Sequence, residues 1–430
     1  MAGRGKWRIG GYGRARPVVK AGRRASGGAG EHPPSVRSPS VTTRLLLGGC
    51  AVSLLLSCRS REHAGAIATS EPTHVVEPSA SSGEKTVKTK ETLPGADAWV
   101  GKRLHVWVTT CDLGAPEAKE LIATASAHRG LFDGVGIACQ AVARDGSFKT
   151  IDEGPAGRGR DALAAKLQSL GIATTLLVAN PGPGGFDGPL GAAVAMDPKA
   201  RAKLVDALVS ARAREHHAGI ELDLEAMPTK AAAGYAELVR AVKTAAGDGV
   251  EVSVDVHPKT VDDPGWDGPG AHDYSAIAEA GAIVRLMTYD LSIGPVPPGP
   301  STKASWVREV VAYARTKKVP AAQLEIGLPA YGYDFPPQGK GAPLALKYNE
   351  IMQLKARVKA AVLRDDAGTP HFAYDAKDGR HEVWFDDAES IGRLLEDLRP
   401  AANDVRGIAI WGVGGADPLL VESLVLAGFR

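Results

Sequence analysis

The chain has 430 residues, which allows one large domain or two ordinary ones, and its 44% hydrophobic and 23% charged residues are typical of a folded globular protein. The formal net charge of +2 is unevenly spread, because residues 1–44 hold ten Lys and Arg and a single acid. The remaining chain has 41 basic and 48 acidic residues, a net charge of −7. This mildly acidic body argues against nucleic acid and against an anionic membrane surface as the binding partner.

A short apolar run, LLLGGCAVSLLLSC, follows the basic stretch and ends at Cys58. It resembles a bacterial lipoprotein signal, in which the cysteine becomes the lipidated first residue of the mature protein. The run is too short to span a bilayer as a stable helix. We therefore expect residues 1–58 to be a basic extension and lipoprotein signal, with Cys58 lipidated. Cys50 is a weaker candidate because fewer apolar residues precede it, and a buried core helix is the alternative interpretation.

Residues 59–98 mix Ser, Thr, Pro, Glu and Lys with few aliphatic side chains, as a disordered tether does. The folded domain is therefore expected to comprise residues 99–430. Two cysteines remain in that part, Cys111 and Cys139, and each ends an apolar run. They can pair if those runs are neighbouring strands, and otherwise they are buried thiols.

Apolar strand-like runs alternate with helical stretches through the rest of the chain. One such stretch begins with Asp197 as a candidate N-cap before Pro198. Strands that alternate with helices pair in parallel through right-handed crossovers, so eight of them predict an α/β fold, the (β/α)8 TIM barrel. The eight predicted strands are LHVWVTT (104–110), GVGIACQ (134–140), ATTLLVAN (173–180), GIELDLE (219–225), VEVSVDVH (250–257), AIVRLMTYD (282–290), LEIGLPAYG (324–332) and GIAIWGVG (407–414).

The segment between the seventh and eighth runs is longer than a simple βα connection. Within it, AYD and HEVWF flank the turn-like AKDG and predict a β-hairpin. A single hairpin and a short helix cannot bury a core of their own. We therefore predict a small β-rich insertion between strands 7 and 8 at the mouth of the barrel, and not a second domain.

The stretch GIELDLEAMP has an acid at every second position, Glu221, Asp223 and Glu225. Residues two apart on a strand share a face, so the acids form one row; the solvated face of an antiparallel strand is the alternative interpretation. In a barrel, Glu221 and Asp223 point inward and Glu225 lies at the carboxyl end, where barrel active sites lie. Crowding in a poorly solvated interior is expected to raise their pKa values and to keep one of them protonated as a proton donor.

This stretch resembles the fourth-strand signature of the family-18 glycoside hydrolases, the chitinase class, which reads Asp-Gly-x-Asp-x-Asp-x-Glu. Aligned on its last residue, the chain reads AGIELDLE over residues 218–225. The resemblance implies that Glu225 is the general acid and that Asp223 orients the acetamido group of the substrate. Glu221 takes the place of the first inward Asp, which implies a substrate-binding role, and reaches one methylene further. Leu224 replaces the usual aromatic residue.

Three later segments resemble the family in the expected order. LMTYDL resembles the sixth-strand Met-x-Tyr-Asp, which implies Tyr289 as the hydroxyl donor to the acetamido oxygen and Met287 and Asp290 as substrate-binding residues. IGLPAYGY resembles the seventh-strand segment and implies Tyr331 in the cleft, while AIWGVGG implies that Trp411 forms the floor of a sugar subsite. Taken singly, each aromatic residue is also consistent with ordinary core packing.

Two further segments refine the resemblance. HEVWFDDAESI and VSVDVHP look more like the barrel hydrolases associated with bacterial cell walls and sporulation than like secreted chitin degraders. On the fifth strand, Asp255 and His257 share a face with Ser253, and Asp255 is a candidate substrate-binding residue. The alternative for both is that they only satisfy neighbouring polar groups. Trp266, in the following loop, is a weaker candidate for stacking on a sugar.

The resemblance implies hydrolysis of a β-linked glycan that contains N-acetylglucosamine, of the chitin-oligosaccharide or peptidoglycan type. In this family the acetamido oxygen of the substrate replaces the enzyme nucleophile and the anomeric configuration is retained. No cofactor and no metal are expected. The alternative is a non-catalytic, lectin-like binding protein on the same fold, although a binding protein has no use for a proton donor; a cell-wall scaffold is a third possibility. We expect a monomer anchored by lipid in the bacterial cell envelope, either periplasmic or at the surface.

Overall fold

The computed structural model describes residues 96–430, except 152–158, 184, 264 and 295. The predicted lipoprotein signal with Cys58 and most of the predicted tether lie outside the described residues, so these remain predictions. Within the described part, no helix combines the length and the apolar character that a membrane span requires.

Eight parallel strands form a closed barrel. They pair in the order β1, β2, β4, β7, β8, β9, β10, β16, and β16 pairs with β1 to close the ring. Each predicted run overlaps one of these strands, which confirms the predicted (β/α)8 barrel. The strands are β1 (Arg103–Val108), β2 (Gly134–Val142), β4 (Thr174–Ala179), β7 (Gly219–Asp223), β8 (Glu251–Val256), β9 (Ile283–Met287), β10 (Leu324–Pro329) and β16 (Gly407–Trp411).

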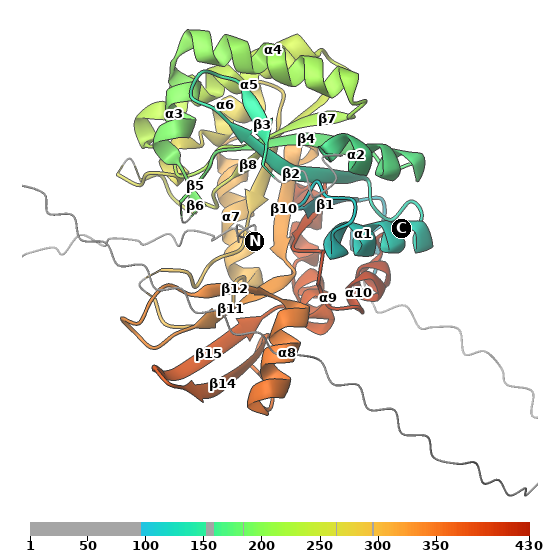
Figure 1. Ribbon diagram of the computed structural model, residues 1–430, viewed down its shortest axis with the longest axis vertical. Coiled ribbons are helices and arrows are strands. Elements are labelled where there is room, and N and C mark those ends of the chain that lie inside the picture. The colour runs from blue at the N-terminus through green and yellow to red at the C-terminus, as the bar shows by residue number, and fades with distance from the viewer. Residues whose placement is uncertain (1–95, 152–158, 184, 264, 295) are drawn as a thin grey trace, which may run out of the picture. The chain divides into compact units, whose positions relative to one another are not determined.

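Helices surround the barrel, and short strands extend its loops (Figure 1). The predicted cap of α4 is confirmed, since the Asp197 side chain accepts from the Lys199 N–H at 2.9 Å and Pro198 is the first helical residue. The α-helices are α1 (Pro116–Ala127), α2 (Gly159–Ser169), α3 (Gly188–Met196), α4 (Pro198–Arg214), α5 (Ala232–Ala246), α6 (Tyr274–Glu279), α7 (Ala304–Thr316), α8 (Tyr348–Val358), α9 (Ala388–Asp397) and α10 (Leu420–Ala427). The 3-10 helices are η1 (Ala96–Trp99), η2 (Thr229–Ala231), η3 (Pro269–Ala271), η4 (Ala321–Gln323) and η5 (Arg399–Asp404), and the short strands are β3 (Phe148–Thr150), β5 (Pro181–Gly182) and β6 (Gly185–Phe186).

The alternation of side chains along the strands creates two cores. On β7, Ile220 and Leu222 are fully buried in the layer between strands and helices. A smaller apolar cluster of Trp107, Leu177 and Ala409 fills part of the barrel interior. Burial of each large aliphatic side chain contributes roughly 1.5–3 kcal/mol, so the outer layer supplies most of the stabilisation. The interior is left with room for polar groups.

The insertion between β10 and β16 is larger than predicted. The predicted hairpin is present as β14 (Pro370–Ala376) and β15 (Gly379–Phe385). It belongs to a five-stranded sheet in the order β12, β11, β15, β14, β13, drawn in orange in Figure 1 together with α8. The expectation that the insertion has no core of its own is wrong, because Ile351, Leu354, Phe372, Val383 and Phe385 form a separate buried cluster between this sheet and α8. The remaining strands are β11 (Tyr331–Phe335), β12 (Leu344–Lys347) and β13 (Leu363–Arg364).

The structure corrects the boundary of one predicted strand. The predicted seventh run is divided, because β10 ends at Pro329 and Tyr331 begins β11 of the insertion. The structure also decides between the two alternatives for the cysteines. Since β1 pairs with β2, Cys111 and Cys139 come together, with their Cα atoms 5.8 Å apart, and form a disulfide.

Candidate active site

Glu225 lies directly after β7 at the mouth of the barrel, and its backbone is fixed by a side chain from another strand. The Asn180 amide, which follows β4, accepts from the Glu225 N–H at 2.8 Å and donates to the Glu225 carbonyl at 2.9 Å. The next residue, Ala226, has a φ of 55°, a conformation that residues other than glycine rarely adopt. Asn180 was not predicted from the sequence, and it orients Glu225 where the strand ends.

Asp223 and Asp255 lie side by side on β7 and β8, buried at the same height in the barrel. Burial, with the charges of Glu225 and Glu221, raises the pKa of Asp223 well above its ordinary value. Burial and the charge of Glu221 also raise the pKa of Asp255, although Arg285 lies 3.6 Å from its carboxyl and opposes the rise. In both carboxyls the protonated form is therefore more favourable than in a solvent-exposed aspartate.

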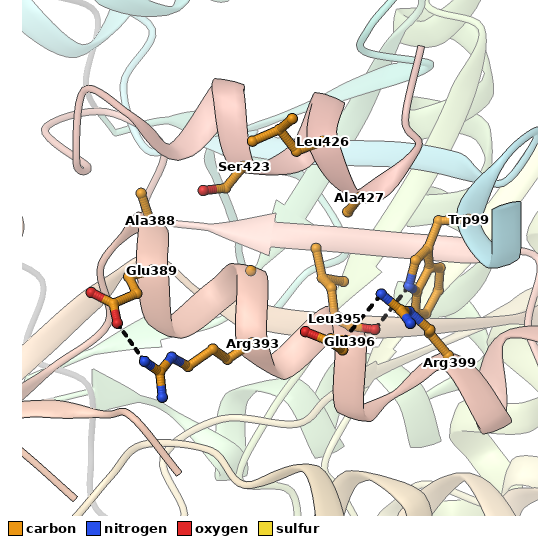
Figure 2. A pocket seen from close by; sticks show the side chains of 11 residues that line it. Trp99, Ala388, Glu389, Arg393, Leu395, Glu396, Arg399, Ser423, Leu426 and Ala427 are labelled. Carbon is orange, nitrogen blue, oxygen red and sulfur yellow. Dashed lines mark hydrogen bonds and ion pairs between the residues drawn. The ribbon is translucent and has the colours of Figure 1, made fainter. Parts of the chain in front are cut away.

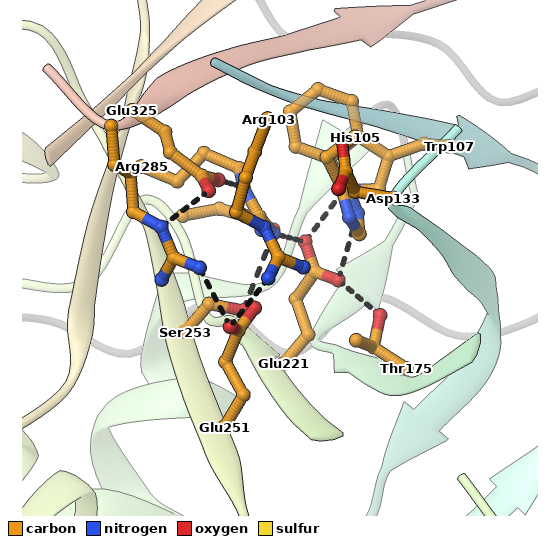
Figure 3. Close-up of polar contacts among 12 residues, drawn as sticks. Arg103, His105, Trp107, Asp133, Thr175, Glu221, Glu251, Ser253, Arg285 and Glu325 are labelled. Carbon is orange, nitrogen blue, oxygen red and sulfur yellow. Dashed lines mark hydrogen bonds and ion pairs between the residues drawn. The ribbon is translucent and has the colours of Figure 1, made fainter. Parts of the chain in front are cut away.

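Glu221, one step deeper in the barrel, has the opposite environment (Figure 3). The Trp107 indole donates to Oε1 at 2.6 Å and the Thr175 hydroxyl donates to Oε2 at 2.6 Å. The Arg285 guanidinium also donates to Oε1. Burial, the largest single influence, would raise the pKa of Glu221, but Arg285, His105 and the Thr175 hydrogen bond together outweigh it and hold the pKa below its usual range. The expectation that crowding raises the pKa of every acid in this row is therefore wrong for Glu221.

A glycine makes room for this arrangement. Gly136 faces the interior from β2, and a Cβ built on it would lie 2.7 Å from Glu221 Oε2 and 2.6 Å from Trp107 Cδ1. Any larger residue would collide with the carboxylate or with its indole donor. The longer side chain of Glu221, a departure from the family pattern, is accommodated at this position.

Tyr289 and Asp290 follow β9 and connect the barrel to the insertion. The Tyr333 hydroxyl donates to Asp290 Oδ1 at 2.7 Å, and the Tyr331 hydroxyl donates to the same atom. The rings of Tyr289 and Tyr331 meet edge to face with their centroids 6.3 Å apart. Burial, with the charges of Asp255 and then Glu225, raises the pKa of Tyr289 well above its ordinary value, so its hydroxyl remains a proton-bearing donor.

Aromatic side chains line the same end of the molecule. Trp411, the last residue of β16, packs with Tyr331 and Tyr333 in one cluster that also includes Trp384 of the insertion. The Trp384 ring stacks on His371, with a centroid distance of 4.1 Å and an interplanar angle of 10°. Neither Trp384 nor Tyr333 was predicted, although the alternation in YGYDF and HEVWF puts both on one face of a strand.

The structure brings most of the predicted residues together at the carboxyl ends of the strands. Glu225, Asp223 and Tyr289 lie there with Tyr331 and Trp411. Met287, the predicted substrate-binding residue that ends β9, is buried. Asp255 lies inside the barrel beside Arg285, and Trp266 is half-buried in the loop after β8. Within the described ranges, no group of three or more His, Cys, Asp and Glu residues is placed to hold a metal ion.

A separate hollow lies away from these acids. It is formed by η1, α9 and α10 and contains none of the predicted site residues (Figure 2). The Trp99 indole donates to the Leu395 carbonyl at its wall, and the Arg393 and Glu389 side chains pair across one turn of α9. Its lining is that of a groove between packed helices, and it does not contribute to the acid cluster.

Comparison with known proteins agrees with this geometry. The chain is 26% identical over 235 residues to the uncharacterized glycosylase YvbX of Bacillus subtilis (strain 168), a match that covers 53% of this chain and 67% of that protein. It is 31% identical over 242 residues to the cortical fragment-lytic enzyme of the same organism, covering 54% of this chain and 55% of the enzyme. The crystal structure of the spore cortex-lytic enzyme SleL of Bacillus megaterium QM B1551 aligns with a TM-score of 0.65 and 25% identity, covering 77% of this chain and 75% of that one.

The matches to these curated relatives span about half to two thirds of the relatives' own lengths. The model of the family described as Glycosyl hydrolases family 18 matches residues 184–416, which is more than half of the chain and includes the acids of β7, Tyr289 and Trp411. This chain therefore belongs to glycosyl hydrolase family 18 and is a glycoside hydrolase.

Proposed function

We propose that this enzyme cleaves a β-linked glycan containing N-acetylglucosamine, with the acetamido oxygen of the substrate as the nucleophile. The observation that supports this most directly is the pairing of Glu225, at the mouth of the barrel, with the buried carboxyl of Asp223 beneath it, whose pKa is raised. A general acid needs a proton at working pH, and an acetamido group needs a polar partner to hold it in position. The two carboxyls supply these functions from one strand.

The proposed reaction assigns one role to each group. Glu225 gives its proton to the glycosidic oxygen as the bond to the anomeric carbon breaks, while the acetamido carbonyl oxygen forms a bond to that carbon. Asp223 accepts the hydrogen bond of the acetamido N–H, and the Tyr289 hydroxyl donates to the acetamido oxygen. Water then attacks the anomeric carbon, the bond from that carbon to the acetamido oxygen breaks, Glu225 takes the proton of the water, and the configuration is retained.

Five more residues are proposed to bind the glycan or to shape its site. Trp411 would form the floor of a subsite, because aromatic faces stack on the apolar faces of sugars, and Tyr331 would line the cleft beside it. Met287, Asp290 and Asp255 would shape the site from below and from the side. Because aromatic residues make up only 5% of the chain, a long stacking platform for crystalline polymer is not proposed.

The relatives are named for spore cortex and cortical fragments. On that basis we propose a cell-wall glycan as the substrate, with chitin oligosaccharides as simpler models of it. The protein is proposed to be a monomer that comprises a lipoprotein signal (1–58), a tether (59–98) and the catalytic barrel (99–430), attached to the envelope through Cys58. Replacement of Cys58 by Ser should release the protein into a soluble fraction, and unchanged membrane association would contradict the anchor.

The function is tested by incubating the protein with chitin oligosaccharides and with peptidoglycan glycan strands, each in N-acetylated and de-N-acetylated form. We expect cleavage of an acetylated glycan only, with the β configuration retained in the first product seen by ¹H NMR. Equal hydrolysis of the two forms would contradict the acetamido mechanism. Binding of acetylated glycan without any cleavage would instead support the lectin-like alternative.

A further inference from the structure

A buried imidazole faces the carboxylate of Glu225, and the reaction proposed above does not use it. His257 follows β8, and the residue is 1% exposed. We propose that His257 is a positioning residue for Glu225: its neutral ring donates the Nδ1–H to the Glu225 carboxylate and stabilises the anion that forms when Glu225 gives up its proton. This inference rests on the proposed role of Glu225 as the general acid.

The contacts of the ring determine which nitrogen carries the proton. Nε2 of His257 accepts the backbone N–H of Ala226 at 3.3 Å, and an amide N–H can only donate. Nε2 therefore carries no proton, and in the neutral ring the proton is on Nδ1. Nδ1 lies 3.4 Å from Oε2 of Glu225. Contacts of this kind are often long in the unliganded enzyme and shorten when the substrate is bound.

A second histidine holds the ring in place. The rings of His257 and His272 stack with their centroids 4.8 Å apart and an interplanar angle of 25°. His272 Nδ1 accepts the backbone N–H of His257 at 2.9 Å, so its other nitrogen donates to the Leu224 carbonyl at 3.0 Å. The pair thus links the segment after β8 to the backbone on both sides of Glu225.

The surroundings keep His257 neutral. The groups that face it are Glu225 from the segment after β7, His272 and the Tyr274 hydroxyl from the segment around η3 and α6, and Lys259 from its own loop. Burial, and then the proximity of His272 and Lys259, lowers the pKa of His257 well below its ordinary value. A protonated imidazole at this position would favour an ionised Glu225 before the reaction. A neutral donor leaves Glu225 its proton and still stabilises the anion after proton transfer.

The same local contact occurs elsewhere in the barrel without any acid cluster beside it. His217, just before β7, has its Nε2 3.4 Å from Oε2 of Glu215 and is likewise 1% exposed. Its Nδ1 is bound to the Thr174 hydroxyl at 2.9 Å. His217 therefore provides a matched control for the cost of removing a buried histidine at the opposite end of the barrel.

The test compares His257→Phe, which keeps a flat ring but no donor, with His257→Asn and His257→Gln. The Asn amide nitrogen takes the place of Nδ1, whereas that of Gln takes the place of Nε2. Without the donor, the ionised form of Glu225 is less favourable, so Glu225 keeps its proton to higher pH. For His257→Phe we expect kcat to fall about tenfold to a hundredfold with little change in KM, as for loss of one hydrogen bond to a charged group. The basic limb of the pH profile should move upward by about one unit.

His257→Asn should restore the basic limb toward that of the wild type, and His257→Gln should not. His217→Phe should lower the melting temperature and leave the limb unchanged. A wild-type limb and kcat in both His257→Phe and His257→Gln would overturn the proposal and reduce His257 to a packing residue. If neither variant folds, His257→Asn decides alone: a basic limb displaced upward as far as expected for loss of the donor would overturn the proposal.

The ¹³C NMR titration of the Glu225 carboxyl, assigned with Glu225→Gln, gives a readout that does not depend on turnover. An upward shift of this titration in His257→Phe is expected, and an unchanged titration would overturn the proposal. If the wild-type protein cleaves no glycan, the proposed function fails. The NMR titration still decides whether His257 acts on Glu225.

Discussion

Two groups of buried acids lie one above the other in the barrel: a lower group of Glu221 and Glu325, and an upper group of Asp223, Asp255 and Glu225 nearer the mouth. The two groups differ in the charges that surround them. In the lower group, Glu221 and Glu325 both contact the fully buried guanidinium of Arg285. In the upper group, the charges that act most strongly on Asp223 are those of Glu225 and Glu221, which are also negative. Glu221 and Asp223, two carboxyls on the same strand, therefore have pKa values displaced in opposite directions.

The lower group is a balanced ionic network that continues toward the amino-terminal ends of the strands (Figure 3). Arg285 Nε donates to Glu325 at 2.8 Å, Glu325 lies 3.4 Å from Arg406, and Arg406 reaches Glu251 at 2.9 Å. Alternating signs allow these charges to be buried at acceptable cost. In the upper group, burial and neighbouring negative charges raise the pKa of Asp223 and of Asp255, which favours their protonated forms. The comparison indicates that the lower acids maintain the fold and the upper acids carry the chemistry.

The largest expected effect comes from removing the central cation. Arg285→Met leaves Glu221 and Glu325 buried without their shared partner, and breaking a buried ion pair in this way costs about 3–5 kcal/mol. Urea unfolding measures the loss. The control is Arg393→Met, because Arg393 and Glu389 form an exposed pair on α9 that is worth at most about 1 kcal/mol. A loss in Arg285→Met no larger than in the control would contradict the assignment of the lower group to stability.

The same substitution made in each group should separate the two roles. Glu225→Gln keeps the shape and removes the transferable proton, so we expect at least about a hundredfold loss of hydrolysis, near 2.7 kcal/mol, with binding of glycan retained. Glu325→Gln removes a charge that Arg285 requires and should lower the unfolding free energy more than it lowers kcat. Steady-state kinetics and urea unfolding of both variants check this. Similar losses of activity in the two would remove the distinction between the groups.

The sequence predicted the barrel and the upper group well because both depend on local periodicity. The row of acids in GIELDLE, and the Tyr in LMTYDL, are placed by strand alternation and by the end of each strand. Once eight strands close in order, residues at their carboxyl ends must meet. The positions of Glu225, Tyr289 and Trp411 at one end of the barrel were therefore predictable without knowledge of any long-range contact, whereas the roles expected of Tyr289 and Trp411 came from the resemblance to the family.

The inward position of Glu221 was predicted, but the contacts of the lower group were not, because they cross the barrel. Arg285 is 64 residues from Glu221 along the chain, and no local pattern pairs them. An Arg within the apolar run AIVRLM was the available signal, since an unpaired cation cannot be buried there. Tyr331 was placed on the wrong element for a related reason. LEIGLPAYG reads as one strand, and only the second sheet shows that it divides after Pro329.

The smallest expected effect is on the pH dependence of stability, and it concerns Asp255. Its folded-state pKa is raised, first by burial and then by Glu221, whereas in the unfolded chain it ionises near pH 4. Between those two values the unfolded state releases a proton that the folded state keeps, so rising pH favours unfolding through this group.

Asp255→Asn removes the effect while keeping the shape. We expect the variant to melt a few degrees above the wild type at pH 8, and the difference should shrink to nothing near pH 4. Melting curves across this range measure it, with Asp378→Asn, an exposed acid on the insertion with a lowered pKa, as the control that shows no gain at pH 8. A stabilisation by Asp255→Asn that is equal at pH 4 and pH 8 would contradict the interpretation, because a packing effect does not follow protonation.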